Sequence, residues 1–339
     1  MTHANSGVEP AGVAQAFARG ARVRAWELAI WIVALLSWFV LPRQAPMLNE
    51  MAILALFAVS LDLILGYAGI VSLGHAAFFG TGAYVAALFA KHWVPDPLAG
   101  LAVAAIAAAL LGLATSVLVL RGSDLTRLMI TLGVALILYE LANRFDRITG
   151  GADGLQGVVM GPLLGLYAFD MGGRVAYCYS LTVLAVLFFV ARRIVHSPFG
   201  YGLKAIRDNP RRAAAIGIGS NVRLAAVYTL AAAYAGVAGA LLAQTAGFAS
   251  LDVYDFHRSA DVLLVLVIGG VGWLYGGLIG AILFTLMHDV LSGLTPQYWQ
   301  FWIGLVLVVL VLMGRERIGR LARRLFSKRR QPAEAEVRP

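Results

Sequence analysis

Long stretches of this chain carry almost no charge, and that feature restricts its fold more than any other. The clearest is Leu101–Leu120, which contains no charged side chain. A helix of about 20 apolar residues spans the hydrocarbon layer of a bilayer. Because the chain is 60% hydrophobic and only 13% charged, we predict an all-α polytopic membrane protein. It would have about ten transmembrane segments, some short or broken, at 25–42, 48–66, 72–91, 97–120, 124–145, 175–195, 222–246, 258–271, 274–292 and 296–314.

The distribution of basic residues predicts the orientation of these segments. With the N-terminus inside and ten crossings, 21 of the 27 lysines and arginines face the cytoplasm. The outer side keeps only Arg43, Lys91, Arg144, Arg147, Arg174 and Arg258. This N-in, C-in solution explains the net charge of +9 and argues against a nucleic-acid partner. We therefore expect a cytoplasmic N-terminal tail at 1–24, a transmembrane domain at 25–314 with an inner loop at 196–222, and a basic cytoplasmic tail at 315–339. Since no small-x-small site follows Leu28–Leu41, this first apolar run is expected to stay as an anchor.

One apolar region is interrupted by glycine, in the stretch GYAGIVSLGHAAFFGTGAY from Gly66 to Tyr84. Unwound backbone at membrane depth survives only inside protein or beside a water-filled cavity, and transporters place substrate sites at such breaks. We therefore predict that this stretch lies beside a transport pathway, with the candidate lining residues Gly66, Gly69, Ser72, Gly74, His75, Gly80 and Thr81.

A similar break recurs in the second half of the chain. Val262–Ile268 meets Gly269-Gly270-Val271-Gly272, and a helix is expected from Leu274. We add Gly269, Gly270 and Gly272 to the predicted pathway. Small residues also recur at helical spacing after each break, which alternatively indicates only tight helix packing. The stripe after the first break is Ala76, Gly80, Ala83 and Ala87, and the stripe after the second is Gly272, Gly276 and Gly280. The span 222–246 carries a third, Ala235, Gly239 and Ala243.

Two carboxylates fall within predicted spans, where charge is costly and often functional. Asp62 precedes the first break by four residues, and we place it on the predicted pathway. Glu140 stands four residues before Arg144, a helical ion-pair spacing. Each carboxylate could instead be buried with a partner.

The inner loop at 196–222 has the sequence features of short helices. Asn209 followed by Pro210 is typical of a helix start, and Gly217 of a helix stop. A second short helix is expected at 201–207. Helices this short and charged stay outside the bilayer, and they suit docking to a cytoplasmic partner. The alternative is a basic surface that contacts anionic lipid.

Catalytic and metal-binding patterns are missing from the sequence. There is no phosphate-binding G-x-x-x-x-G-K-[ST] loop, no H-E-x-x-H and no G-x-S-x-G. The single cysteine, Cys178, excludes an internal disulfide, and the six histidines are scattered. We therefore predict a protein that is not an enzyme and that binds neither metal nor cofactor.

Four stretches together resemble a known family. They are GYAGIVSLGHAAFFGTGAY, TGGADGLQG, SPFGYGLKAIRDNPRRAAAIGI and VLLVLVIGGVGWLYGGLIGA, in this order. Over residues 48–314 the chain is similar to the permease subunits of bacterial branched-chain amino-acid ABC transporters, the LivM-like type.

The resemblance implies a multi-pass subunit of the bacterial inner membrane. Its partners would be a second, related permease subunit, two cytoplasmic ABC ATPases that hold ATP and Mg²⁺, and a periplasmic substrate-binding protein. The ATPase-coupling segment of the family maps onto Tyr201, Lys204, Arg207, Asp208, Asn209, Pro210, Arg211, Arg212 and Gly217. An outer loop motif maps onto Thr149, Gly150, Gly151, Asp153 and Gly154, where turn-forming residues dominate.

The chain departs from the family pattern at two places. Relatives usually have asparagine where Asp62 stands, and many have an aromatic stretch where this chain reads Arg121–Thr126. Substrate is therefore open: branched-chain amino acids, related amino acids, or the urea and short amides that some relatives carry. A rival from another class is an ion-driven secondary transporter, for which Asp62 would be the ion-coupling carboxylate.

Overall fold

Helices form every regular element in the part of the chain that the structure describes, apart from two isolated β-bridges. The computed structural model describes residues 25–170 and 172–313. The predicted tails at 1–24 and 315–339 lie outside these ranges. Within them, the all-α prediction is confirmed.

Each predicted apolar segment contains one helix. These are α2 (Ala25–Val40), α3 (Ala45–Leu65), α4 (Ala76–His92), α5 (Pro97–Val119), α6 (Asp124–Arg144), α8 (Arg174–Val195), α11 (Ser220–Ala246), α12 (Phe256–Gly269), α13 (Leu274–Leu294) and α14 (Trp299–Met313). In the described residues, six helices are long and apolar enough to cross a membrane: α3 with the preceding turn η1 (Pro42–Gln44), α5, α6, α8, α11 and α13. The order and direction of ten crossings stay a prediction.

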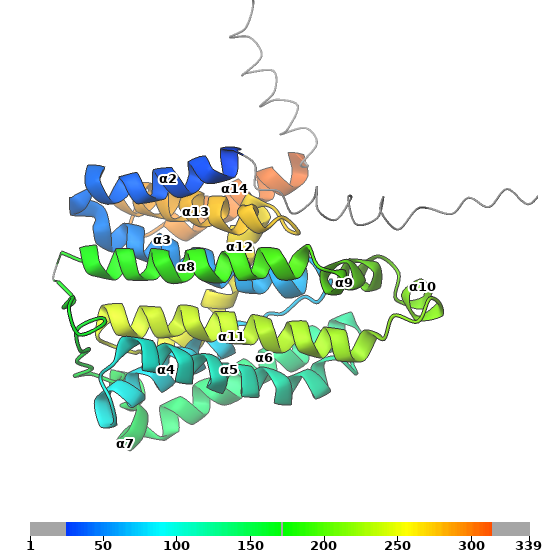
Figure 1. The fold of residues 1–339 in the computed structure, drawn as a ribbon, viewed down its shortest axis with the longest axis horizontal. Helices are drawn as coiled ribbons and strands as arrows, with labels where there is room; N and C mark the ends of the chain where they lie inside the picture. Colours follow the sequence, from blue (N-terminus) through cyan, green and yellow to red (C-terminus); the bar gives the residue numbers. More distant parts are fainter. Residues whose placement is uncertain (1–24, 171, 314–339) are drawn as a thin grey trace, which may run out of the picture. The chain divides into compact units, whose positions relative to one another are not determined.

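The long helix α11 lies at the centre of the packing, against α3, α4 and α5 (Figure 1). Small residues allow this close approach. A methyl group at Gly239 would collide with the carbonyl of Phe79 in α4, and one at Gly82 with the backbone of Gly236. At these positions the small-residue stripes act in helix packing.

Short helices occupy the two ends of this bundle. The inner loop forms α9 (Pro198–Asp208) and α10 (Pro210–Ala215), which project together from one end (Figure 1). The loop between α6 and α8 forms α7 (Asp146–Thr149) and η2 (Gly151–Asp153), and α7 lies at the opposite end. This arrangement fits the predicted placement of the two loops on opposite sides of a membrane.

The chain divides after Leu283 into two compact units. The described part of the second unit holds the end of α13 and α14, where the rings of His288 and Trp299 meet edge to face at 4.5 Å.

In the first unit, Glu140 and Arg144 are both exposed, and no ion pair joins them in the structure.

Candidate functional site at the helix breaks and the α9–α10 pair

The first break is a tightly bonded turn between α3 and α4. Gly66 and Tyr67 both donate their N–H groups to the Asp62 carbonyl, at 2.7 and 3.2 Å, and Ile70 donates to the Ile64 carbonyl at 2.9 Å. Gly69 has a φ of +73°, a left-handed conformation that favours glycine. These bonds pair part of the backbone of the break within the protein, as an apolar setting requires.

Buried side chains hold the start of α4 beside this turn. His75 is completely buried and lies 2.8 Å from the hydroxyl of Ser60 through its Nε2 atom. Because Ser60 donates its one hydroxyl proton to the Phe57 carbonyl at 2.6 Å, we assign the bridging proton to His75 Nε2. The N–H of Ala76 donates to Ser259 of α12 at 2.9 Å, which satisfies one of the open donors at the start of α4.

The two helix breaks meet at Asp62. Its Oδ1 atom accepts the N–H of Gly272, in the second break, at 2.7 Å. A Cβ on Gly66 would lie 2.5 Å from Gly272 N and would also collide with Asp62 Oδ1. Gly272 has a φ of +78°. Glycine at both positions therefore permits a hydrogen bond between residues 210 positions apart.

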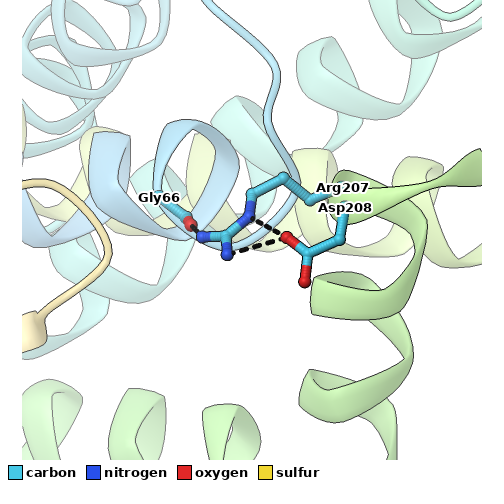
Figure 2. Close-up of polar contacts among 3 residues, drawn as sticks. All are labelled: Gly66, Arg207 and Asp208. Atoms are coloured by element: carbon cyan, nitrogen blue, oxygen red, sulfur yellow. Dashed lines mark hydrogen bonds and ion pairs between the residues drawn. The ribbon is translucent and has the colours of Figure 1, made fainter.

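Helix α9 reaches the same point through Arg207. Its Nη1 atom donates to the Gly66 carbonyl, at the C-terminal end of α3 (Figure 2). The rest of the guanidinium is held by Asp208, whose Oδ1 atom accepts from Nε at 3.1 Å and from Nη2 at 3.0 Å. A positive charge at a helix C-terminus also interacts favourably with the helix dipole.

A second basic residue of α9 faces the first break. The Lys204 ammonium lies 5.2 Å from the ring centres of both Tyr67 and Tyr201, within range of cation–π attraction. Burial lowers the pKa of Lys204, and neighbouring Arg207 adds to that shift. Lys204 and Arg207 are three residues apart, so one face of α9 contacts the break.

Helix α10, unlike the inner face of α9, is largely exposed. Asn209 caps it by accepting the N–H of Arg212 at 3.0 Å, and Pro210 takes the first turn, as the sequence predicted. Gly217 follows with a φ of +82°. Arg211, Arg212 and Gly217 are exposed, whereas Ala213 is buried. Ile216 is 74% exposed.

The remaining predicted pathway residues are enclosed by protein or lie against it. Ser72 is buried, Gly74 packs on the Thr131 carbonyl and Gly80 on the ring of Tyr254. Thr81 donates to the Ala77 carbonyl at 2.7 Å. Gly269 and Gly270 pack against Gly276 of α13. Only Asp62, Gly66, Gly69 and Gly272 come together with the inner loop, and a pathway role for the set stays a prediction.

The outer loop motif forms one wall of a polar cavity of about 430 Å³. Thr149 donates to the carbonyls of Ala142 and Phe145, and Gly150 and Gly154 take left-handed conformations. Leu155 pairs with Ala249, which fixes the loop to the segment after α11. The cavity is lined by Lys91, His92, Asp146, Arg147, Ile148, Gly150, Asp153, Gly154, Leu155 and Gln156.

Sequence reasoning missed a buried ion pair between α2 and α8. Arg192 Nη1 lies 2.9 Å from Glu27 Oε2, with both side chains less than a tenth exposed. Glu27 was the available signal, because a carboxylate at the start of an apolar run needs a partner. Among the described residues, no three His, Cys, Asp or Glu side chains group closely enough to hold a metal ion.

A family model and several known proteins match the sequence of this chain. Residues 45–312 match the family model described as "Branched-chain amino acid transport system / permease component". The chain is 28% identical to the high-affinity branched-chain amino acid transport system permease protein LivM of Salmonella typhimurium and 29% identical to that of Escherichia coli. These alignments cover 84% and 76% of the chain, and 72% and 65% of the relatives.

A sugar permease is also similar. The galactose/methyl galactoside import permease protein MglC of Haemophilus influenzae is 26% identical over 84% of the chain and 92% of the relative. No solved structure matches the chain. With the family model covering most of its length, the chain belongs to the branched-chain amino acid transport system permease family and is a multi-pass, non-catalytic membrane component of an ABC importer.

Proposed function

We propose that this subunit translocates branched-chain or related amino acids that a periplasmic binding protein delivers. Two cytoplasmic ATPase subunits hydrolyse ATP for the transport, and a second, related permease subunit completes the pore. The complex resides in the bacterial inner membrane. The family description and the two LivM relatives support this substrate class.

The observation that carries the proposed ATPase coupling is the contrast between α9, which packs on the bundle, and α10, which is exposed. One face of α9 is held against the helix break, while α10 projects from the bundle with Arg211, Arg212 and Ile216 exposed. Arginine is enriched at protein interfaces, so a short exposed helix that carries two arginines and an isoleucine is a surface that a protein partner can cover. Tyr201, at the start of α9, is also partly exposed.

The test is co-purification of the complex from cells that express all of its subunits. We expect wild-type protein to retain both ATPase subunits, and Arg211→Glu/Arg212→Glu or Ile216→Asp to retain at least about tenfold less, as for loss of a binding hot spot. Arg144→Glu reverses an exposed charge at the C-terminal end of α6, next to α7, and serves as the control. Equal retention by the α10 variants and the control would contradict the proposal.

The substrate is tested separately with the reconstituted complex. We expect uptake of labelled leucine to be inhibited by isoleucine and valine but not by urea, acetamide or galactose. Galactose is included because MglC is a relative. Inhibition by galactose or urea alone would show that the substrate is of that class and not an amino acid. The proposed ATPase coupling would be unaffected.

A further inference from the structure

Three segments that lie far apart in the sequence converge on the end of α3. They are the first break at Gly66 and Gly69, the second break at Gly272, and the C-terminal end of α9 at Arg207. A Cβ on Gly272 would lie 3.4 Å from the Gly66 carbonyl oxygen and 3.5 Å from Arg207 Nη1. The three segments are therefore in direct contact at this point.

Two polar side chains join these segments. Arg207 connects α9 to the first break through the Gly66 carbonyl, and Asp62 connects the first break to the second through Gly272 N–H. The guanidinium cannot turn freely, because Asp208 holds its other edge at 3.0–3.1 Å. The carboxylate is completely buried, so its position is fixed as well.

Close packing restricts motion of α9 independently of the first break. Cγ of Arg207 would lie 2.8 Å from a Cβ on Gly69, so the Arg207 stem packs directly on the backbone of the break. Lys204 adds a second contact from the same face of α9, to Tyr67. Displacement of α9 must therefore move the first break or rupture a charge-assisted hydrogen bond, which is among the stronger kinds.

We propose that Arg207 and Asp62 form a junction that transmits movement of α9 to both helix breaks at once. The proposal rests on the proposed function, since it takes α9–α10 as the place where the ATPase subunits act. Arg207 and Asp62 are positioning residues in this account and do not contact the substrate.

The junction also predicts what Asp62 must supply. Gly272 N–H needs an acceptor, and an asparagine side chain offers an oxygen in the same place. A negative charge is not required for that bond. An ion-coupling carboxylate, by contrast, would lose its role on amidation.

The first experiment uses the complete complex in proteoliposomes and compares Arg207→Ala, Arg207→Lys and Arg193→Ala. Arg193 is an exposed arginine at the end of α8 and gives the matched loss of charge. We expect Arg207→Ala to keep its ATPase subunits bound, which also reports correct folding, while uptake per ATP hydrolysed falls at least about tenfold, the effect of losing a hydrogen bond to a charged group. Lysine should restore part of the loss, and Arg193→Ala should match the wild type.

The second experiment compares Asp62→Asn with Asp62→Leu. We expect the asparagine variant to keep most of its uptake and the leucine variant to lose at least about tenfold. The double variant Arg207→Ala/Asp62→Leu should be no worse than either single variant, because the two residues act in one chain of contacts.

Four outcomes would overturn the junction. These are Arg207→Ala that transports like Arg193→Ala, Arg207→Ala that loses its ATPase subunits, Asp62→Asn as damaged as Asp62→Leu, or additive losses in the double variant. A wild-type protein that retains no ATPase subunit would instead overturn the proposed function, and the junction with it.

Discussion

At the scale of single residues, charge in this chain is placed where a partner or a helix end can satisfy it. Arg207 meets the C-terminal carbonyl of α3, and Asp62 meets a backbone N–H. Glu27 and Arg192 satisfy each other between α2 and α8. Since a buried charge without a partner costs far more than a buried pair, the contacts of Asp62 and of the Glu27–Arg192 pair restrict how their helices can pack.

The Glu27–Arg192 pair gives a direct prediction about stability. Arg192→Leu leaves Glu27 buried without its cationic partner and should lower the free energy of unfolding by about 3–5 kcal/mol. The double variant Glu27→Leu/Arg192→Leu removes both charges and should be markedly more stable than the single variant. Chemical or thermal unfolding of purified protein in detergent measures both effects.

Neighbouring Arg193 is exposed and provides the control for that experiment. Arg193→Leu should change stability by no more than about 0.5 kcal/mol, as surface substitutions usually do. Equal destabilisation by Arg192→Leu and Arg193→Leu would show that the pair has no special role.

At the scale of elements, the sequence predicted those features that contacts between neighbouring residues determine, such as helix starts and the positions of the breaks. Asn209 and Pro210 start α10 because the Asn209 side chain accepts a backbone N–H of the first turn and the proline ring fixes a helical backbone angle. The helix expected at 201–207 is real but begins at Pro198, which takes the first turn, although Ser197 makes no side-chain capping bond. Both glycine breaks also fall where the sequence placed them, between α3 and α4 and between α12 and α13.

The junction could not be predicted in this way. Its hydrogen bonds join residues 141 and 210 positions apart, and no period or motif encodes such pairings. The same holds for the buried surroundings of Ser72, His75 and Gly80. Sequence identified these residues as unusual, but only the fold shows that each is packed against protein.

Close packing of α4 on α11 is the element-scale feature most open to test. A methyl group on Gly239 meets the Phe79 carbonyl, so Gly239→Ala should force the helices apart and destabilise the protein by about 1–3 kcal/mol. Gly133 of α6 has open space around its Cβ position, and Gly133→Ala should be neutral or slightly stabilising. Unfolding of the two variants in the same detergent makes the comparison. Equal effects would refute the tight contact.

At the scale of the whole molecule, the unit that ends at Leu283 combines a helical bundle with a small exposed helix, α10. The family relationship explains why no phosphate-binding loop is present, since ATP is bound by other subunits of the importer. In Figure 1, α10 lies at the opposite end of the bundle from α7, and our proposal takes α10 as the contact for those subunits.

The most direct test of this account is site-specific cross-linking from α10. Cys178 is the only cysteine, so Cys178→Ser provides a background in which Ile216→Cys can carry a benzophenone maleimide. Leu166→Cys, 79% exposed in the outer loop, is the control position. In membranes that contain the complete importer, we predict that illumination joins residue 216, and not residue 166, to an ATPase subunit. Absence of that adduct at residue 216 while leucine uptake remains active would contradict the account.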